Sequence, residues 1–359
     1  MFLRCLPSVF VINDEYEILI FANQNGLIGI RIDGQIFYEE NTGALYTEKD
    51  FAKIRVPQKL LDDAKSYQVV YRKSIERCPY FSRLEDEICC EFKFKPLEKT
   101  ENINIYHVAD VHYEFEEAIK TCSYFGNDLD LLIVNGDIGE VNSEQEYFMV
   151  AKFVGDVAKG ELPVIFVRGN HDVRGRLAER YTDYFPANGK DTFFVFSVGN
   201  LNGVVLDCGE DKLDSHPEYG GVNDFKRFRE RETKFLKNVR FEDGDKITFG
   251  VCHIAPIQVT LVPDSCYDIE RQTYAVWNDI LEKLGVKFFI CAHRHIAYLL
   301  LKGDPKNLID HEYPVIVCSV FDKNKSIVAG CAMVLSKSHL NAKITDNNLL
   351  VLDEFDFDI

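Results

Sequence analysis

The sequence predicts an α/β protein in which a layered domain of strands and helices follows a smaller all-β domain. Residues 1–98 contain short strand-like runs separated by turns and prolines, a pattern typical of a small β-sandwich. From residue 99 onward, apolar strand-like runs alternate with helical stretches, which favours layers of strands and helices. We therefore divide the chain into an N-terminal β-sandwich domain, residues 1–98, and a second domain, residues 99–359.

Residues 26–38 carry the clearest strand signal of the first domain. Apolar and polar residues alternate there around Asp33-Gly34, and such a pair between alternating runs is a strong hairpin signal. Further strands are expected at residues 68–72 and 89–94.

The second domain begins with a β-α-β-α-β alternation. The expected strands are residues 102–109, 129–134 and 163–167, and the expected helices are residues 114–125 and 144–159. Two later apolar runs, residues 246–252 and 287–292, predict strands on either side of a helix at residues 274–284.

Charge and cysteine usage limit the classes of function. The formal net charge is −17, from 58 acidic and 41 basic residues, which argues against a broad basic face for long nucleic acid. A small phosphorylated substrate stays compatible, because a bound dication can reverse the local field. The 11 cysteines form no C-x-x-C pair and indicate buried thiols in a reducing compartment.

The N-terminus is apolar but is broken by Arg4 and Pro7, and the chain has no apolar run of membrane-spanning length. We therefore expect neither a signal peptide nor a membrane span. A cytoplasmic protein without membrane partners is the resulting expectation.

Polar residues with metal-binding side chains follow each predicted strand of the second domain. Ligand sites in α/β sheets collect beyond the carboxyl ends of strands, and five of the nine histidines occupy these turns. Each motif alone is weak, but five in order are hard to obtain by chance. The motifs are Asp110-Val-His112, Asn135-Gly-Asp137, Gly169-Asn170-His171-Asp172, a single His253 and His293-Arg-His295.

This ordered set of motifs resembles the calcineurin-like metallophosphoesterase superfamily over residues 100 to 300. Written as patterns, the motifs are D-x-H, G-D-x-x-E, G-N-H-D, a single His and H-x-H. The β-rich front segment resembles, more loosely, the layout of purple acid phosphatases. The resemblance implies a β-sandwich flanked by helices, an enzyme that hydrolyses phosphoesters, and two adjacent divalent metal ions. It implies that Asp110, His112 and His295 hold one ion, that Asn170, His253 and His293 hold the other, and that Asp137 bridges both.

The donor chemistry agrees with such a centre. Carboxylate, carboxamide and imidazole donors suit Mn, Fe, Zn or Co rather than Ca or Cu(I). Two such ions can share and activate a hydroxide at neutral pH, so the expected reaction is in-line attack of this hydroxide on the phosphorus of a monoester or diester.

His171 and Asp172 are expected to act in catalysis rather than in metal binding. His171 matches the family's histidine at the leaving-group oxygen, and the alternative is a structural histidine in a turn. We expect Asp172 to hydrogen-bond the His171 imidazole and raise its pKa. Arg174 is a candidate for bidentate binding of a substrate phosphate, although most such arginines are solvated surface residues.

Two positions depart from the family patterns. Glu140 stands where purple acid phosphatases have a tyrosine ligand, so we expect no tyrosinate-ligated ferric site, and we interpret Glu140 as a solvated acid. Ala292 replaces the usual glycine before H-x-H, and because Ala is the mildest replacement we expect the site to survive.

Two further hypotheses stay open. The first is a catalytically silent protein that keeps the metallophosphoesterase fold as a binding or scaffold module. The presence of every expected ligand and of His171 argues for the enzyme instead. The second is that the N-terminal β-domain is a separate binding module.

Overall fold

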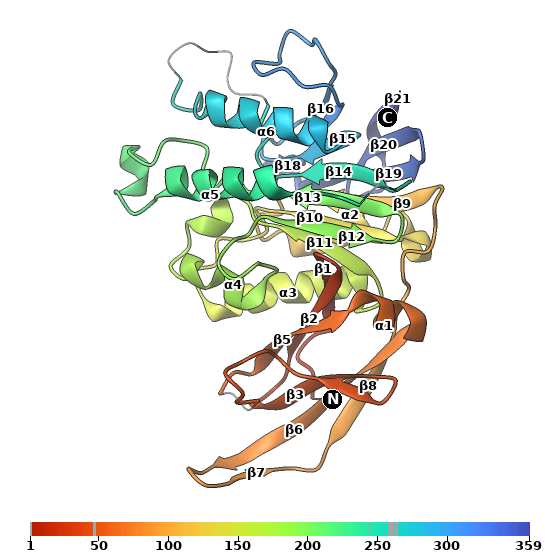
Figure 1. The fold of residues 1–359 in the computed structure, drawn as a ribbon, viewed down its shortest axis with the longest axis vertical. Coiled ribbons are helices and arrows are strands. Elements are labelled where there is room, and N and C mark those ends of the chain that lie inside the picture. Colours follow the sequence, from red (N-terminus) through yellow and green to blue (C-terminus); the bar gives the residue numbers. More distant parts are fainter. Residues whose placement is uncertain (1, 46–47, 243, 258–261, 263–264) are drawn as a thin grey trace.

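Two large β-sheets lie face to face, with helices outside them, in the computed structural model of the chain (Figure 1). The structure describes residues 2–45, 48–242, 244–257, 262 and 265–359. Within this described part, none of the helices combines the length and apolar character needed to cross a bilayer.

The first large sheet has ten strands and contains both the first and the last strand of the chain. Along it the order is β21-β20-β19-β9-β10-β11-β1-β2-β5, and β18 pairs with β19. Its strands are β1 (Ser8–Ile12), β2 (Glu15–Phe21), β5 (Phe51–Pro57), β9 (Ile103–Val108), β10 (Leu131–Asn135), β11 (Pro163–Val167), β18 (Val320–Asp322), β19 (Ile327–Ser336), β20 (His339–Thr345) and β21 (Val351–Asp358).

The second large sheet has six strands in the order β12-β13-β14-β15-β17-β16. Its strands are β12 (Phe194–Val198), β13 (Leu201–Val205), β14 (Ile247–Val251), β15 (Phe288–Cys291), β16 (Ala297–Leu300) and β17 (Val315–Cys318). The strands β13, β14, β15 and β17 run parallel, as β9, β10 and β11 do in the first sheet.

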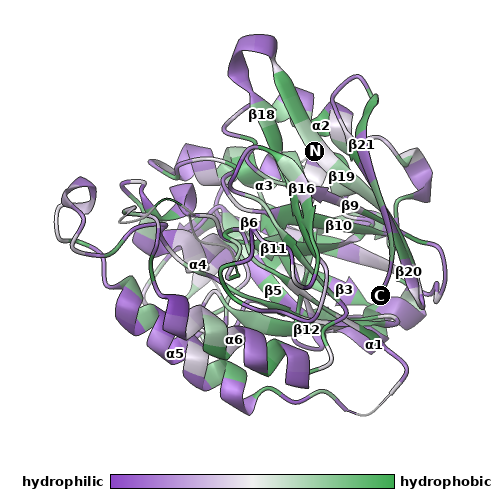
Figure 2. Cartoon of the chain, turned by 90° about the horizontal axis from the view of Figure 1, so that it is seen from above, coloured by the Kyte–Doolittle hydropathy of each residue, from purple (hydrophilic) through white to green (hydrophobic). Residues whose placement is uncertain are grey.

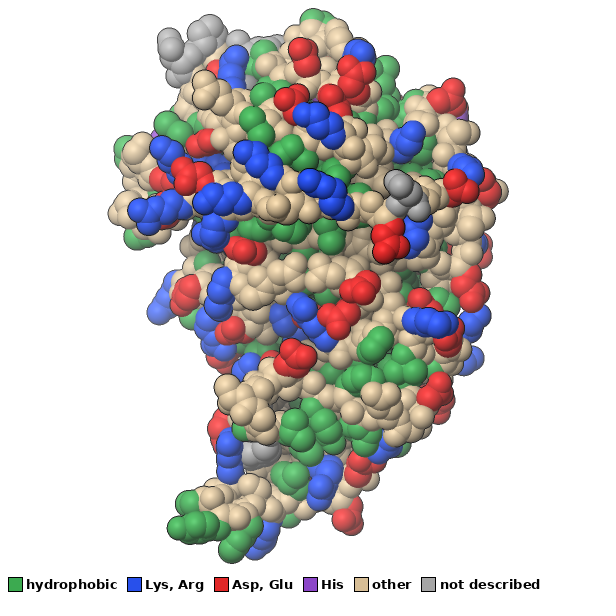
Figure 3. Space-filling view, in the orientation of Figure 1, with side chains coloured by type: hydrophobic (Ala, Val, Ile, Leu, Met, Phe, Trp, Pro, Cys, Tyr) green, Lys and Arg blue, Asp and Glu red, His purple; other side chains and the backbone are tan. Residues whose placement is uncertain are grey.

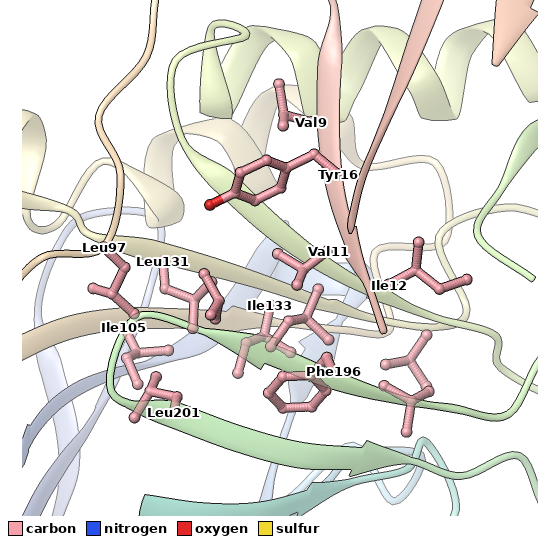
Figure 4. Packing of buried hydrophobic residues seen from close by; sticks show 14 of the residues in the cluster. Val9, Val11, Ile12, Tyr16, Leu97, Ile105, Leu131, Ile133, Phe196 and Leu201 are labelled. Atoms are coloured by element: carbon pink, nitrogen blue, oxygen red, sulfur yellow. The ribbon is translucent and has the colours of Figure 1, made fainter. Parts of the chain in front are cut away.

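The apolar core forms separate layers on the two faces of the ten-stranded sheet. Successive residues of a strand point to opposite faces, so neighbouring side chains of one strand enter different layers. Val9 and Val11 of β1 join the apolar cluster between the two sheets, together with Ile133 of β10 and Phe196 of β12 (Figure 4). Phe10 of β1 joins a second cluster on the outer face of the ten-stranded sheet.

Helices cover both outer faces. α2 (Phe115–Cys122), α3 (Glu144–Ala158) and α4 (Tyr181–Tyr184) contribute to the cluster on the ten-stranded sheet. α5 (Phe225–Asn238) and α6 (Arg271–Lys283) cover the six-stranded sheet, where Trp277 is fully buried. Figure 2 shows hydrophilic and hydrophobic stretches along α5 and α6, as expected for helices with one buried face.

A five-stranded sheet forms the end of the molecule farthest from α6 (Figure 1). Its inward side chains, such as Ile28 and Val69, join Ile18 of β2 and Ile54 of β5 in the same cluster. The strands are β3 (Gly26–Ile32), β4 (Gln35–Phe37), β6 (Ser66–Arg77), β7 (Ser82–Leu84) and β8 (Ile88–Lys93), and α1 (Gln58–Ala64) lies beside them.

The predicted fold class is confirmed: a layered β-sandwich flanked by helices accompanies a smaller N-terminal all-β sandwich. The hairpin at Asp33-Gly34 forms between β3 and β4. The smaller sandwich is not isolated, because β1 pairs in parallel with β11 and so brings β2 and β5 into the larger sheet. A domain boundary at residue 98 stays a prediction.

Candidate metal centre

The metal-binding motifs of both large sheets converge at one place. Because the two sheets face each other, the turns at the carboxyl ends of their central parallel strands meet across the sandwich. The ten-stranded sheet contributes Asp110 and His112 after β9, Asp137 after β10 and Asn170 after β11. The six-stranded sheet contributes His253 after β14, and His293 and His295 after β15.

The first group of potential ligands is Asp110, His112 and His295. One donor atom from each of the three residues lies within 4.8 Å of the others. The His295 imidazole donates to Asp110 Oδ1 across 3.1 Å, and the Nε2 atoms of His112 and His295 are 3.2 Å apart. The structure therefore gathers the three side chains that the resemblance assigns to one ion.

The second group is Asp137, His253 and His293, whose donor atoms satisfy the same 4.8 Å limit. His253 Nε2 lies 3.1 Å from Asp137 Oδ2 and 3.8 Å from Asp110 Oδ1. His253 thus stands between the carboxylates of the two groups, which makes the groups neighbours.

Unsatisfied buried atoms provide a test of whether a metal fits here. Asn170 Oδ1 is buried and has no hydrogen-bond partner among the described residues, and the buried His253 Nε2 faces only the Asp137 carboxylate at 3.1 Å and the Asp110 carboxylate at 3.8 Å. A buried polar atom without a partner costs free energy unless another ligand satisfies it. Both atoms are of the kind that coordinates divalent cations, so the residues present fit a metal centre.

Left-handed backbone conformations occur at five of the seven expected ligands. Non-glycine residues adopt positive φ rarely, and such strain collects at functional sites. Hydrogen bonds from backbone N–H groups hold two of these turns: His112 N donates to the Asp137 carbonyl oxygen at 3.1 Å, and His293 N donates to the side-chain Oδ2 of Asp110 at 2.9 Å. The five residues are Asp110 (φ 51°), His112 (45°), Asp137 (56°), His293 (70°) and His295 (52°).

Two glycines allow the turns after β10 and β11 to touch. A Cβ on Gly169 would lie 2.2 Å from Asp137 Oδ1, and a Cβ on Gly136 would lie 2.5 Å from Gly169 Cα. Gly136 also has a φ of 76°, which favours glycine. Glycine at position 169 thus leaves room for the Asp137 carboxylate, and glycine at position 136 leaves room for the backbone of Gly169.

A chain of buried hydrogen bonds orients His253. Its Nδ1 donates to the carbonyl oxygen of Asn135 across 2.6 Å, which directs Nε2 toward the carboxylates. The Asn135 amide donates to His107 Nε2 at 3.0 Å, and His107 Nδ1 lies 3.1 Å from Cys318 Sγ. Sequence reasoning missed His107 and Cys318, which lie inside strands and resemble ordinary core residues.

The two buried carboxylates concentrate negative charge. Burial alone would lower the pKa of His253, but Asp137 and Asp110 outweigh burial and raise that pKa to about 10. Burial would raise the pKa of Asp110, and the neighbouring histidines hold it well below its usual range instead. The centre therefore attracts positive charge, which divalent ions supply.

The structure corrects the expected role of Asp172. Its Oδ2 accepts hydrogen bonds from the backbone N–H groups of Gly169 at 2.8 Å and Asp137 at 3.1 Å, and not from the His171 imidazole. His171 Nδ1 has no hydrogen-bond partner, and burial lowers rather than raises the pKa of His171. Asp172 thus ties together the two turns that carry Asp137 and Asn170.

His171 lies beside the metal groups without belonging to either. Its ring centre is 4.9 Å from that of His112, and its backbone N–H donates to Asp137 Oδ1 at 2.8 Å. Its Nδ1 faces the Glu140 carboxylate at 3.6 Å. Glu140 is 49 % exposed, in agreement with its interpretation as a solvated acid.

Arg174 is largely committed to other protein groups. Its Nε and Nη2 each donate to the carboxylate of Glu210 at 2.7 Å, and the Glu210 side chain is fully buried. Nη1 remains directed toward the centre, 3.3 Å from His171 Nε2. A role of Arg174 in substrate binding stays a prediction, and only Nη1 is placed for it.

Sequence reasoning also missed Asp211 and Phe321. Asp211 Oδ2 lies 3.6 Å from His293 Nε2, and the Phe321 ring packs against both His112 and His295. Neither belongs to a recognisable motif, because both reach the centre from distant loops or strands. Ala292 is tolerated because its φ is not positive and its N–H donates to His253 O.

Comparison with known proteins agrees with this geometry. A purple acid phosphatase isolated from yellow lupin (Lupinus luteus) seeds is similar in structure, with a TM-score of 0.63 and 10 % identity over 98 % of this chain and 74 % of that chain. A structure of PhoD is similar with a TM-score of 0.58 and 10 % identity over 99 % of this chain and 90 % of that chain. At this identity the likeness shows the fold alone.

The sequence comparisons are more specific. No curated protein matches the chain. The family model described as calcineurin-like phosphoesterase matches residues 103–297, which is more than half of the chain and spans all seven expected ligands. The chain therefore belongs to the calcineurin-like phosphoesterase family.

Proposed function

We propose that this protein hydrolyses a small phosphomonoester or phosphodiester at a centre that holds two divalent metal ions. The observation that supports this most is the pair of adjacent ligand groups, each with three donor atoms within 4.8 Å of one another. His253 Nε2 lies within 3.8 Å of a carboxylate from each group, so both sites belong to one centre.

The donor set restricts the ions. Asp110, His112 and His295 would hold one ion, His253, His293 and Asn170 the other, and Asp137 would bridge them. Mixed carboxylate, amide and imidazole donors favour Mn, Fe or Zn. When bound, such a pair of ions supplies Lewis-acid charge for the phosphoryl oxygens and lowers the pKa of a water nucleophile.

The protein's own residues would position the substrate and hold the leaving-group proton. His171 lies beside the first ligand group, through its contact with His112, and outside both coordination sets. We assign its imidazole to the leaving-group oxygen, where a histidine can donate a proton or a hydrogen bond. We assign Arg174 Nη1, which lies 3.3 Å from His171 Nε2, to a phosphoryl oxygen in the same region.

A catalytically silent scaffold protein is the alternative. It would retain the fold but have no need of orphaned metal-type donors or of an uncoordinated histidine beside them. The unpartnered Asn170 Oδ1 and the placement of His171 favour the enzyme.

The test combines metal analysis with a panel of phosphoesters. We expect freshly purified protein to contain about two divalent ions per chain, and Mn-, Fe- or Zn-loaded protein to cleave aryl phosphate monoesters or diesters. Asp137→Asn should lower kcat by about a thousandfold or more, because it removes the carboxylate that would bridge the ions.

A matched control separates this effect from a general loss of fold. Asp245→Asn changes a carboxylate that is 92 % exposed and lies outside the centre, and it should leave kcat unchanged. If the metal-loaded wild type cleaves none of the esters while binding two ions, the scaffold alternative is correct and the proposal is wrong.

A further inference from the structure

A narrow pocket adjoins the metal centre at His293. Its cavity volume is about 40 Å³, and the cavity opens to solvent. His293 lines this pocket and also belongs to the second ligand group with Asp137 and His253. A phosphoester held at the centre therefore has this pocket as an immediate neighbour for one of its substituents.

Apolar and aromatic side chains make up most of the pocket wall. Ile254 and Ala255 follow the ligand His253 directly, and Tyr298 lies on β16, shortly after the ligand His295. The same turns that carry ligands thus continue into the pocket. The described apolar and aromatic residues that line it are Ile254, Ala255, Ile269, Tyr267, Tyr274 and Tyr298.

The charged groups of the pocket nearly cancel. Asp211 and Arg294 each contribute one charge of opposite sign. Lys212, whose Nζ lies 3.2 Å from the Asp211 carboxylate, also pairs with Glu218 at 3.0 Å, so it adds no net charge beside the pocket. The pocket therefore favours neither an anionic nor a cationic substituent, and its affinity comes from apolar contact.

We infer that this pocket binds an aromatic ring carried by the leaving group of the substrate, so that the natural substrate is a phosphoester of an aromatic alcohol. The inference rests on the proposed function. Three tyrosine rings line a narrow space, and aromatic rings gain from stacked or edge-to-face contact beyond the area that they bury. A flat ring also fits a narrow pocket better than a saturated ring of equal carbon number.

The first experiment compares three phosphate monoesters whose leaving alcohols have similar acidity: benzyl, cyclohexylmethyl and propyl phosphate. Similar acidity removes differences in intrinsic reactivity. With the metal-loaded protein, kcat/KM for benzyl phosphate should exceed that for propyl phosphate by about tenfold or more. It should exceed that for cyclohexylmethyl phosphate by about threefold to tenfold.

A variant identifies the pocket as the source of this preference. Tyr298→Leu keeps an apolar side chain but removes one ring, and the benzyl over cyclohexylmethyl preference should fall to about one, mainly through KM. The matched control is Tyr80→Leu, at the end of the β6–β7 hairpin, where Tyr80 is 95 % exposed. That hairpin lies at the opposite end of the molecule from β16 (Figure 1), so the control should keep the preference.

Binding measurements test the inference on the wild-type protein, even if it hydrolyses none of the esters. Calorimetry on the metal-loaded protein with inorganic phosphate, benzylphosphonate and cyclohexylmethylphosphonate should show the benzyl compound binding about threefold to tenfold more tightly than the cyclohexylmethyl compound. The inference is overturned if the two phosphonates bind with equal affinity, or if the benzyl and cyclohexylmethyl esters have equal kcat/KM. Either result leaves the proposed function intact. Absence of all hydrolysis overturns the proposed function, while the phosphonate ranking still decides the pocket.

Discussion

At the scale of single residues, the centre depends on backbone conformations that most side chains avoid. Asp110 and Asp137 are among five expected ligands with positive φ, and each such residue costs about 1 kcal/mol or more. The surrounding hydrogen bonds, such as that from His293 N to Asp110 Oδ2, keep these turns in place. Strain of this kind is retained where a function needs the exact position of a side chain.

Gly169 offers a sharp test of this packing. Gly169→Ala would place a Cβ 2.2 Å from Asp137 Oδ1, and we expect a loss of about 2–3 kcal/mol in the free energy of unfolding together with a loss of bound metal. Urea denaturation and metal analysis measure both effects. Gly244→Ala is the matched control, because its Cβ would meet nothing closer than 4.0 Å among the described residues, and retention of metal by the Gly169 variant would contradict the prediction.

His107 should make stability depend on pH. Burial lowers its pKa to about 3, whereas an unfolded histidine takes up a proton below about pH 6.5. The unfolded chain therefore binds more protons between these values, so stability is full above pH 6.5 and falls as the pH falls. In metal-free protein, the loss between pH 7 and pH 5 should be about 2 kcal/mol smaller in His107→Gln than in the wild type.

His339 provides a control of opposite sign for that experiment. Asp358 and Asp356 accept hydrogen bonds from this exposed imidazole and raise its pKa. Its contribution to stability is present below about pH 6.5 and is lost as the pH rises through the raised value. His339→Gln should therefore not reduce the loss on acidification, and a reduction equal to that of His107→Gln would refute the assignment to burial.

At the scale of elements, α3 shows how local sequence signals start a helix on the face of the ten-stranded sheet. Ser143 stands before the helix, and its Oγ accepts from Glu146 N at 3.3 Å. The Glu146 carboxylate reaches back to the N–H of Asn142 at 2.9 Å, close to a capping box. The apolar face of α3, including Tyr147 and Phe153, packs into the outer cluster.

Removal of this cap should destabilise the protein without changing the centre. Ser143→Ala should lower the free energy of unfolding by about 1 kcal/mol, measured by urea denaturation, and metal content should stay the same. Ser143→Asp keeps an acceptor at the start of the helix and should remain close to the wild type. Equal stability of all three proteins would show that the cap contributes nothing.

At the scale of the whole molecule, the first strands of the chain belong to the sheet that supports the centre. β1 lies between β11 and β2, and its side chain Val11 lies near Ile133 and Phe196 in the cluster that joins the two large sheets (Figure 4). The β6–β7 hairpin, in contrast, projects from the other end and exposes apolar side chains at its tip (Figure 3).

Deletion of residues 1–98 should therefore prevent folding rather than release an independent enzyme. It would leave β11 as an unpaired edge and open the core between the sheets. Circular dichroism and thermal unfolding should show no cooperative transition for the truncated chain. Replacement of residues 78–81 by Asn-Gly, which shortens only the exposed tip, is the control that should fold normally, and a folded, metal-binding 99–359 fragment would refute the prediction.

Much of this architecture follows from local pattern. The strand expected at residues 163–167 is β11 without a change of bounds, and the helix expected at 144–159 is α3 within one residue. β11 is a continuous buried run and α3 has helical periodicity with a cap, and short stretches of chain determine such signals on their own. Asp211 and His107 escaped prediction, because their contacts join residues that are far apart in the chain.

The sequence by itself determined the β-α-β-α-β order at the start of the second domain, the seven expected ligands and the family, because ligand types recur in the turns after successive strands. Tertiary structure alone decided that β1, β2 and β5 extend the larger sheet, that Asp172 binds backbone N–H groups instead of His171, and that a pocket with tyrosine rings adjoins His293. The physical reason is the range of the interactions. Hydrophobic period and turn chemistry act over a few residues, whereas sheet order, buried hydrogen bonds and pocket walls depend on which distant segments pack together.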